Sequence, residues 1–242
     1  MGQGRDAFSG DAMTERPVFA FCLPRSGSTL LMRLANRCMD EHGNAVVMRG
    51  ENRCMANHLQ SVKRLYDEIR TYEQNTSGGT LADVEARDLF PSCWNEFDDE
   101  AFRQSLANVV CAWISADAAT TWGFKETNHG LNGAGKLEEL TQFLRWLFPG
   151  ARFWVHLRSV DQVVNSMMKC PRHWFGRCRI KARARIVKQR QAFVHLAAEW
   201  DDVLHTYYSD LRDYDKFADK VSTLGWTISE TDYSNVMNKV LK

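Results

Sequence analysis

The sequence predicts an α/β protein in which a parallel β-sheet is flanked by helices on both faces. Short apolar segments alternate along the chain with longer segments of helical character, a pattern typical of parallel strands joined by crossover helices. The first apolar segment leads into a turn of small residues and then into a helix, which places this turn at the carboxyl edge of the sheet. The chain has 242 residues, and this length fits one α/β domain with a substantial core.

Five segments have the character of buried parallel strands. Each is short, apolar or β-branched, and bounded by polar residues or glycine. In chain order they span residues 18–23, 45–48, 121–124, 152–157 and 203–208. A sheet built from them would bring the residues that follow each strand to one common edge.

Helical segments are predicted between these strands. They span residues 30–39, 52–72, 101–119, 136–148, 161–168 and 181–200. Residues 1–16 are polar and contain glycine, so we expect no ordered structure there, and residues 17–242 are expected to form a single domain. The polar stretch 74–80 opens an insertion, and we interpret residues 52–120 as a helical cap over the site rather than a second domain.

The bulk charge excludes some classes of partner and leaves others open. The formal net charge is +1, so no global field favours nucleic acid or a membrane surface. Positive charge gathers locally in residues 172–190, either as a solvated helix face or as a basic rim that attracts an anion. No apolar run is long enough to span a bilayer, and we recognise no secretory signal.

The cysteines predict a reducing compartment. There are seven of them, an odd number scattered over strands and helices, which favours free thiols in a cytoplasmic protein over a disulfide framework. No cysteine and histidine grouping has the spacing of a zinc site, so no metal is expected.

The turn after the first strand has the composition of a phosphate-binding loop. It reads Pro-Arg-Ser-Gly-Ser-Thr-Leu-Leu over residues 24–31. Small side chains let the backbone approach a phosphate, the following helix directs its N–H groups and dipole at the anion, and an arginine adds a bidentate charge. The predicted phosphate ligands are Arg25, Ser26, Gly27, Ser28, Thr29 and Leu30.

Two better-known phosphate loops do not fit this segment. In the loop of nucleoside triphosphatases a lysine follows the second glycine, but Ser28 stands at that position and Cys22 stands where the first glycine would be. The phosphatase loop needs an arginine six residues after its cysteine, and Ser28 again occupies that place. A kinase that uses this loop to bind ATP remains an alternative, but the loop has no lysine at the position where such enzymes carry one.

A second motif changes the interpretation of the first. Arg158 ends the apolar strand 152–157, and Ser166 follows eight residues later on a helix. This pair resembles the 3′-phosphate-binding segment of sulfotransferases, and residues 24–31 resemble their 5′-phosphosulfate-binding loop. The resemblance extends from Pro17 to about Ile228, and within the superfamily it is strongest to tyrosylprotein sulfotransferases and related bacterial-type enzymes.

Three further segments carry this resemblance. Residues 49–53 are similar to the segment that supplies a catalytic glutamate, here Glu51. Residues 123–126 are similar to the strand end with a catalytic lysine, here Lys125. Residues 207–211 resemble a nucleotide-contacting segment, here with Tyr208.

The resemblance implies a sulfotransferase fold, a P-loop-type parallel sheet, and transfer of a sulfuryl group from 3′-phosphoadenosine 5′-phosphosulfate (PAPS). It implies catalytic roles for Arg25, Lys125 and Glu51, with Glu51 as the general base toward a hydroxyl or amine. Histidine is the rival base, and His129 is the candidate. We favour a small-molecule acceptor, while peptide and carbohydrate acceptors stay open. A homodimer is also an open expectation. A nucleotide-binding module without catalytic activity is a further alternative function.

Overall fold

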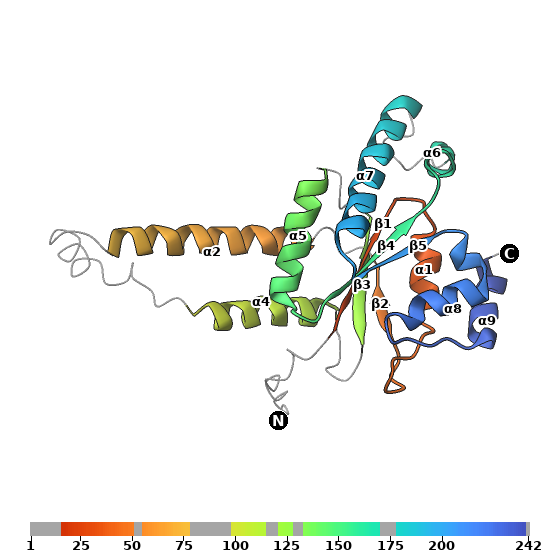
Figure 1. The fold of residues 1–242 in the computed structure, drawn as a ribbon, viewed down its shortest axis with the longest axis horizontal. Helices are drawn as coiled ribbons and strands as arrows, with labels where there is room; N and C mark the ends of the chain where they lie inside the picture. The colour runs from red at the N-terminus through yellow and green to blue at the C-terminus, as the bar shows by residue number, and fades with distance from the viewer. Residues whose placement is uncertain are drawn as a thin grey trace, which may run out of the picture.

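The protein contains a parallel sheet of five strands. The computed structural model describes residues 16–50, 55–77, 98–114, 121–127, 133–169 and 178–240. The strands are β1 (Val18–Cys22), β2 (Val47–Arg49), β3 (Trp122–Glu126), β4 (Arg152–Leu157) and β5 (Val203–Tyr207). They are ordered β2-β3-β1-β4-β5, and every pair is parallel (Figure 1). The predicted α/β architecture is confirmed.

The strand boundaries differ most from the predicted ones in β2 and β3. Strand β3 extends two residues beyond residue 124, so that Lys125 and Glu126 belong to the strand itself. Both are buried polar residues, at 5% and 0% exposure, and a sequence pattern that seeks apolar residues ends too early at such positions. Strand β2 begins at Val47, because Ala45 instead forms an isolated antiparallel bridge with Met39.

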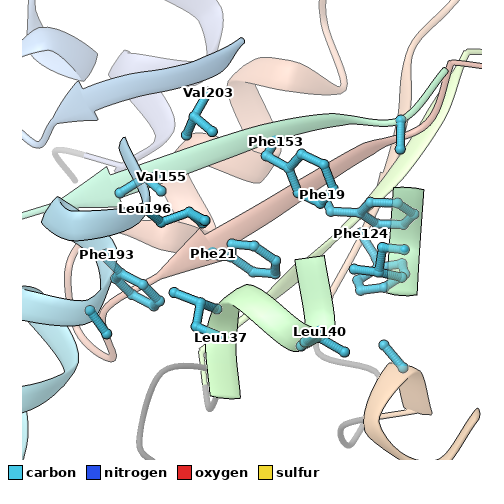
Figure 2. Packing of buried hydrophobic residues seen from close by; sticks show 14 of the residues in the cluster. Phe19, Phe21, Phe124, Leu137, Leu140, Phe153, Val155, Phe193, Leu196 and Val203 are labelled. Atoms are coloured by element: carbon cyan, nitrogen blue, oxygen red, sulfur yellow. The ribbon is translucent and has the colours of Figure 1, made fainter. Parts of the chain in front are cut away.

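One face of the sheet packs against α5 (Ala134–Leu147) and α7 (Arg179–Glu199). Phe19 and Phe21 of the central strand contact Phe153 of β4 on this face, with ring centroids 5.8 and 5.9 Å apart. Figure 2 shows these rings between the sheet and the side chains of the two helices, among them Leu137 and Phe193. Burial on both faces explains why β1 consists of uninterrupted apolar residues.

The opposite face packs against α1 (Ser28–Ala35), α8 (Tyr214–Ser222) and α9 (Glu230–Val240). Trp154 of β4 lies against Phe217 and Trp226, with centroids 6.3 and 6.1 Å away. The first helix is shorter at its carboxyl end than predicted and starts at Ser28, directly after the glycine turn. Helices α8 and α9, and the short 3₁₀ helix Asp210–Arg212, were not predicted.

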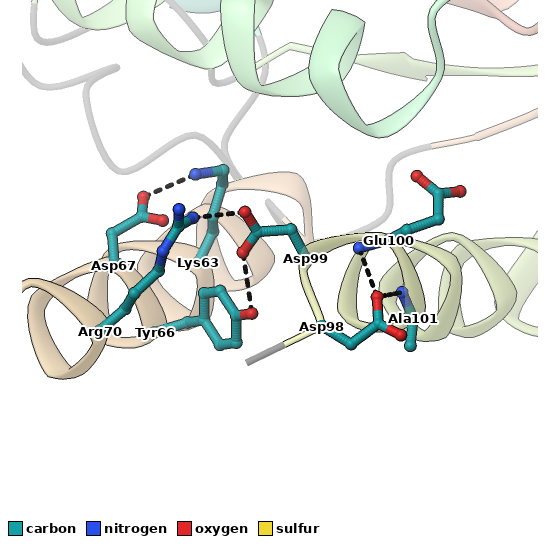
Figure 3. A network of polar contacts seen from close by, with 8 residues as sticks. All are labelled: Lys63, Tyr66, Asp67, Arg70, Asp98, Asp99, Glu100 and Ala101. Atoms are coloured by element: carbon teal, nitrogen blue, oxygen red, sulfur yellow. Dashed lines mark hydrogen bonds and ion pairs between the residues drawn. The ribbon is translucent and has the colours of Figure 1, made fainter. Parts of the chain in front are cut away.

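Helices α2 (Met55–Ser77) and α4 (Asp99–Ile114) extend away from the sheet beside α5 (Figure 1). The ring of Tyr66 stacks on Phe102 at 3.9 Å, and the Tyr66 hydroxyl donates to Asp99 at 2.9 Å. Arg70 forms an ion pair with the same carboxylate (Figure 3). Asp98 begins α4 as its N-cap, because its Oδ1 accepts from the backbone N–H of Ala101 at 2.9 Å.

Helix α6 (Val160–Met168) follows β4 and lies against α7. Within the described part of the chain, no helix is long and apolar enough to cross a membrane. The predicted N-terminal segment falls almost entirely outside the described residues, as do much of the predicted cap and residues 172–177 of the basic segment 172–190.

Candidate active site

The phosphate-loop sequence connects the central strand to α1 at the carboxyl edge of the sheet. Gly27 is the N-cap residue of α1 and has a φ of 96°, a left-handed conformation that glycine adopts without strain. No side chain caps this helix, so its first-turn N–H groups remain for an anion. Arg25 is also left-handed, with a φ of 59°, which is uncommon for a residue with a side chain and is found most often at functional turns.

The end of β5 closes against this loop. A Cβ atom on Gly27 would lie 2.4 Å from Cδ2 of Tyr208, far inside van der Waals contact. Tyr208 is fixed there because its backbone N–H donates to the carbonyl of Leu157 at 2.9 Å. Glycine is therefore required at position 27 both by backbone conformation and by the tyrosine ring beside it.

The second predicted phosphate motif meets the first in space. Nε of Arg25 donates to Oγ of Ser166 at 3.2 Å, and Nη1 of Arg158 donates to the carbonyl of Arg25 at 3.3 Å. The Arg158 guanidinium also lies over the Tyr208 ring, 4.1 Å from its centroid. The predicted residues Arg25, Arg158, Ser166 and Tyr208 thus form one cluster, although more than 130 residues separate the two motifs.

The orientation of Arg158 follows from the start of α6. Ser159 is the N-cap of this helix and accepts from the N–H of Gln162 at 3.3 Å. The Gln162 side chain in turn accepts from Nε of Arg158 at 3.0 Å. Among the described residues, no carboxylate forms an ion pair with Arg25 or Arg158. The cluster of Arg25, Arg158, Ser166 and Tyr208 therefore carries two positive charges.

Strand β3 places Lys125 one strand away from the loop. Lys125 pairs in register with Ala20 of β1 and is 5% exposed. The segment beyond it is held from two sides. Oε1 of Glu126 accepts from the N–H of Thr127 at 2.9 Å, and Nε2 of Gln189 donates to the carbonyl of Thr127 at 2.8 Å. The strand end that carries Lys125 is therefore fixed by α7.

The predicted base lies outside the described residues, and so does its rival. Glu51 comes two residues after the end of β2, and His129 comes three residues after the end of β3. Within the described segments, no three of the residue types His, Cys, Asp and Glu gather as metal ligands would.

Buried polar contacts lie beneath the loop, and one of them is made by a histidine for which the sequence predicted no role. Oγ of Ser26 is buried and has no hydrogen-bond partner among the described residues. The carbonyl oxygen of the same residue lies 3.1 Å from Nε2 of His156. A single histidine within the apolar strand 152–157 was the available sequence signal.

A separate cavity of about 520 Å³ opens at the other end of α1. It is lined by residues of α1, its C-terminal turn and α9: Arg33, Asn36, Arg37, Asn235, Val236 and Lys239. None of the predicted site residues contributes to it.

The fold and the cluster together define a class of protein: a parallel α/β protein with an anion-binding loop after its first strand and a second basic motif after its fourth. The model of the sulfotransferase family matches residues 17–224, and the chain belongs to this family. Among solved structures, it is similar to the sulfotransferase domain of the olefin synthase of Synechococcus PCC 7002. The identity is 16% and the TM-score 0.50, over 92% of this chain and 78% of that one. None of the curated proteins compared with the chain matches it.

Proposed function

We propose that the protein transfers a sulfuryl group from PAPS to a hydroxyl or amine of an acceptor. The observation that carries this proposal is the contact between the two phosphate motifs, in which Arg25 reaches Ser166 and Arg158 reaches the Arg25 carbonyl. A ligand with phosphates on the 3′ and 5′ positions of one ribose needs two anion sites this close together. An ADP-like nucleotide would leave the second site without a partner.

The proposal assigns roles to both motifs. The loop from Arg25 to Leu30 holds the 5′-phosphosulfate with backbone N–H groups, hydroxyls and one guanidinium. Among the described residues the buried Ser26 hydroxyl has no hydrogen-bond partner, which supports this role, since a buried polar group is costly until a ligand, an ion or a water satisfies it. Arg158 and Ser166 hold the 3′-phosphate, and Tyr208 supports the Arg158 guanidinium from below.

Sulfuryl transfer resembles phosphoryl transfer, because it is an in-line displacement in which positioning and charge stabilisation do most of the catalysis. Lys125 and Arg25 are proposed to stabilise the negative charge that develops on the bridging oxygen. Glu51 is proposed to accept the proton of the acceptor as the new bond forms. Positively charged side chains supply the charge stabilisation, so the proposed reaction needs no metal.

The acceptor is proposed to be a small molecule, enclosed by the insertion over residues 52–120. Peptide and carbohydrate acceptors are tested in the same screen, in which PAPS carrying labelled sulfate is incubated with members of each acceptor class. Label transferred to small alcohols, phenols or amines supports the proposal. Label transferred only to peptides or only to carbohydrates would reassign the acceptor class.

The nucleotide is tested by protection against thermal unfolding. A ligand that binds the folded state raises Tm in proportion to the logarithm of its concentration over Kd. We expect 3′,5′-ADP to raise Tm and ATP with Mg²⁺ to leave it unchanged. Protection by ATP with Mg²⁺ alone, together with turnover that EDTA abolishes and Mg²⁺ restores, would replace the proposal with a kinase. Binding of 3′,5′-ADP without any turnover of PAPS would indicate an inactive binding module.

A further inference from the structure

Three side chains form a buried hydrogen-bonded chain beneath the phosphate loop. His156, Trp154 and Thr206 are all 0% exposed. Nε1 of Trp154 donates to Oγ1 of Thr206 at 2.8 Å, and Oγ1 of Thr206 lies 2.9 Å from Nδ1 of His156. Nε2 of His156 lies 3.1 Å from the carbonyl oxygen of Ser26. The hydrogen-bonded chain runs from Trp154 of β4 through Thr206 of β5 and His156 of β4 to the loop.

The chemistry of the two ends fixes every proton in this chain. A carbonyl oxygen can only accept, so Nε2 of His156 must carry the hydrogen. An indole N–H can only donate, so Thr206 accepts from Trp154 and its own hydroxyl hydrogen is free to donate to Nδ1. Burial lowers the pKa of His156 to about 4, so the ring is neutral at pH 7. One tautomer, with its hydrogen on Nε2, satisfies all three groups.

This tautomer sets the direction of a peptide group in the loop. In a trans peptide the C=O and N–H bonds point in opposite directions, and the described residues contain no cis peptide bond. His156 holds the Ser26 carbonyl inward, toward β4. The N–H of Gly27, in the same peptide group, therefore points outward, toward the mouth of the loop where an anion would bind.

We propose that His156 is a positioning residue that orients the Ser26–Gly27 peptide toward the 5′-phosphate end of the nucleotide, with Thr206 and Trp154 fixing its tautomer. This inference rests on the proposed function, because it assumes that the loop binds the 5′ end. Its role differs from that of Arg158, which belongs to the second motif and is proposed to hold the 3′-phosphate. His156 itself is fully buried and touches no ligand.

The test compares two nucleotides in one set of variants. We expect His156→Leu to weaken binding of 3′,5′-ADP about tenfold, the order expected for one lost hydrogen bond. Binding of adenosine 3′-monophosphate, which lacks the 5′-phosphate, should change less than twofold. His156→Gln, whose amide N–H can replace the Nε2–H, should recover most of the affinity. His205→Leu is the matched control, because this half-buried neighbour on β5 makes no contact with the loop among those described, and it should bind both nucleotides normally.

Calorimetric titration of the folded variants decides the outcome. Unchanged affinity of His156→Leu for 3′,5′-ADP would overturn the inference, and so would an equal loss for both nucleotides, since it would show a general rather than a 5′-specific effect. If His156→Leu does not fold, Thr206→Val takes its place. We then expect a smaller loss of affinity for 3′,5′-ADP, again without a loss for adenosine 3′-monophosphate. Unchanged affinity for 3′,5′-ADP in this variant would count against the inference.

A second measurement needs no ligand. A long-range ¹H–¹⁵N spectrum of the free protein at pH 7 should show His156 as the neutral tautomer with its hydrogen on Nε2. A hydrogen on Nδ1 would overturn the inference whatever the nucleotide data. If the wild-type protein does not bind 3′,5′-ADP, the proposed function is wrong. The tautomer measurement then still tests the hydrogen-bonded chain of His156, because it needs no ligand.

Discussion

At the scale of single residues, Arg158 is the side chain with the most connections in the cluster. It donates to the Arg25 carbonyl and to Gln162, and it lies over Tyr208. These contacts hold the guanidinium in place before any ligand binds, which lowers the entropic cost of gripping a phosphate. Pre-organisation of this kind is what a residue that reads one phosphate of a nucleotide requires.

Arg158→Ala is predicted to weaken binding of 3′,5′-ADP by about 1.5–3 kcal/mol, the contribution of a hydrogen bond to a charged group. Binding of adenosine 5′-phosphosulfate, which has no 3′-phosphate, should hardly change. Arg152→Ala is the matched control, since Arg152 begins the strand that precedes Arg158, and the one hydrogen bond of its guanidinium among the described residues goes to the Thr223 carbonyl at 3.3 Å. Isothermal titration checks the pair. Equal losses for both nucleotides would show that Arg158 does not read the 3′-phosphate.

His156 makes stability depend on pH with a defined sign. Burial holds its pKa at about 4, below the ordinary 6.5; the hydrogen bond to the Ser26 carbonyl and the charge of Asp210 oppose this shift, and His205 and Arg158 act in the same direction as burial. Between these two pH values the unfolded chain binds more protons than the folded one, so the folded state loses stability as pH falls. The loss is complete below about pH 4 and amounts to about 3 kcal/mol, since one pKa unit corresponds to about 1.36 kcal/mol.

We therefore predict that His156→Gln, which has no group titrating in this range, loses less stability than the wild type as the pH falls from 6.5 to 4. Urea unfolding at a series of pH values measures the difference. Carboxylates titrate in both proteins and cancel in the comparison. Two curves that stay parallel over this range would show that His156 is not buried in neutral form.

At the scale of elements, the junction between β1 and α1 depends on one glycine. Gly27→Ala introduces a left-handed alanine, at a cost of about 1–2 kcal/mol, and drives a methyl group into the Tyr208 ring, at a further cost of about 1–3 kcal/mol. Gly43→Ala is the matched control. Gly43 also has a positive φ, of 78°, but its Cβ would meet nothing within 4 Å.

The expected result is a lower Tm for both variants and a clearly larger drop for Gly27→Ala, with loss of 3′,5′-ADP binding in that variant alone. For a chain of this size, each kcal/mol corresponds to roughly 2–4 °C in Tm. Differential scanning calorimetry provides the comparison. Similar drops in Tm for the two variants would mean that the Tyr208 ring moves aside at little cost.

Uniformly buried strands are among the elements that the sequence predicted well. Strands β1 and β4 are buried on both faces, and their apolar runs mark them within a residue at each end. Helices α8 and α9 were missed, although Asp213 caps α8 by accepting from the N–H of Lys216 at 3.2 Å. Only Phe217 and Val221 of α8 are buried, and so short an apolar stripe among charged residues is a weak signal.

At the scale of the whole molecule, the parallel pairing of strands brings together two phosphate motifs that lie far apart in the sequence. The spacing of Arg158 and Ser166 could be predicted because both lie within one strand–helix unit. That Arg25 contacts Ser166 depends on the pairing of β1 with β4, and no local sequence pattern indicates which strands pair. The contact between His156 and Ser26 depends on the same pairing and had no local signal, because nothing near a lone histidine reveals its partner.

The strand order also divides the site into two halves. Arg25, Arg158 and Tyr208 follow β1, β4 and β5, whereas Lys125 lies in β3, and the proposed base Glu51 comes after β2 in the sequence. We expect the first half to determine nucleotide affinity and the second half to determine the rate of transfer to the acceptor. Variants from the two halves should therefore affect different constants.

Glu51→Gln tests the second half. This change keeps the size of the side chain and removes its proton-accepting carboxylate, so kcat should fall by roughly 10²–10⁴, the usual contribution of a general base, while Kd for 3′,5′-ADP stays within about twofold. The loss should shrink with an acceptor that is already ionised at the assay pH, because no proton has to be removed from it. His129→Ala is measured in parallel as the rival base. Near-normal turnover of Glu51→Gln beside an inactive His129→Ala would transfer the role of base to His129, and a large change in Kd for Glu51→Gln would contradict the division of the site into two halves.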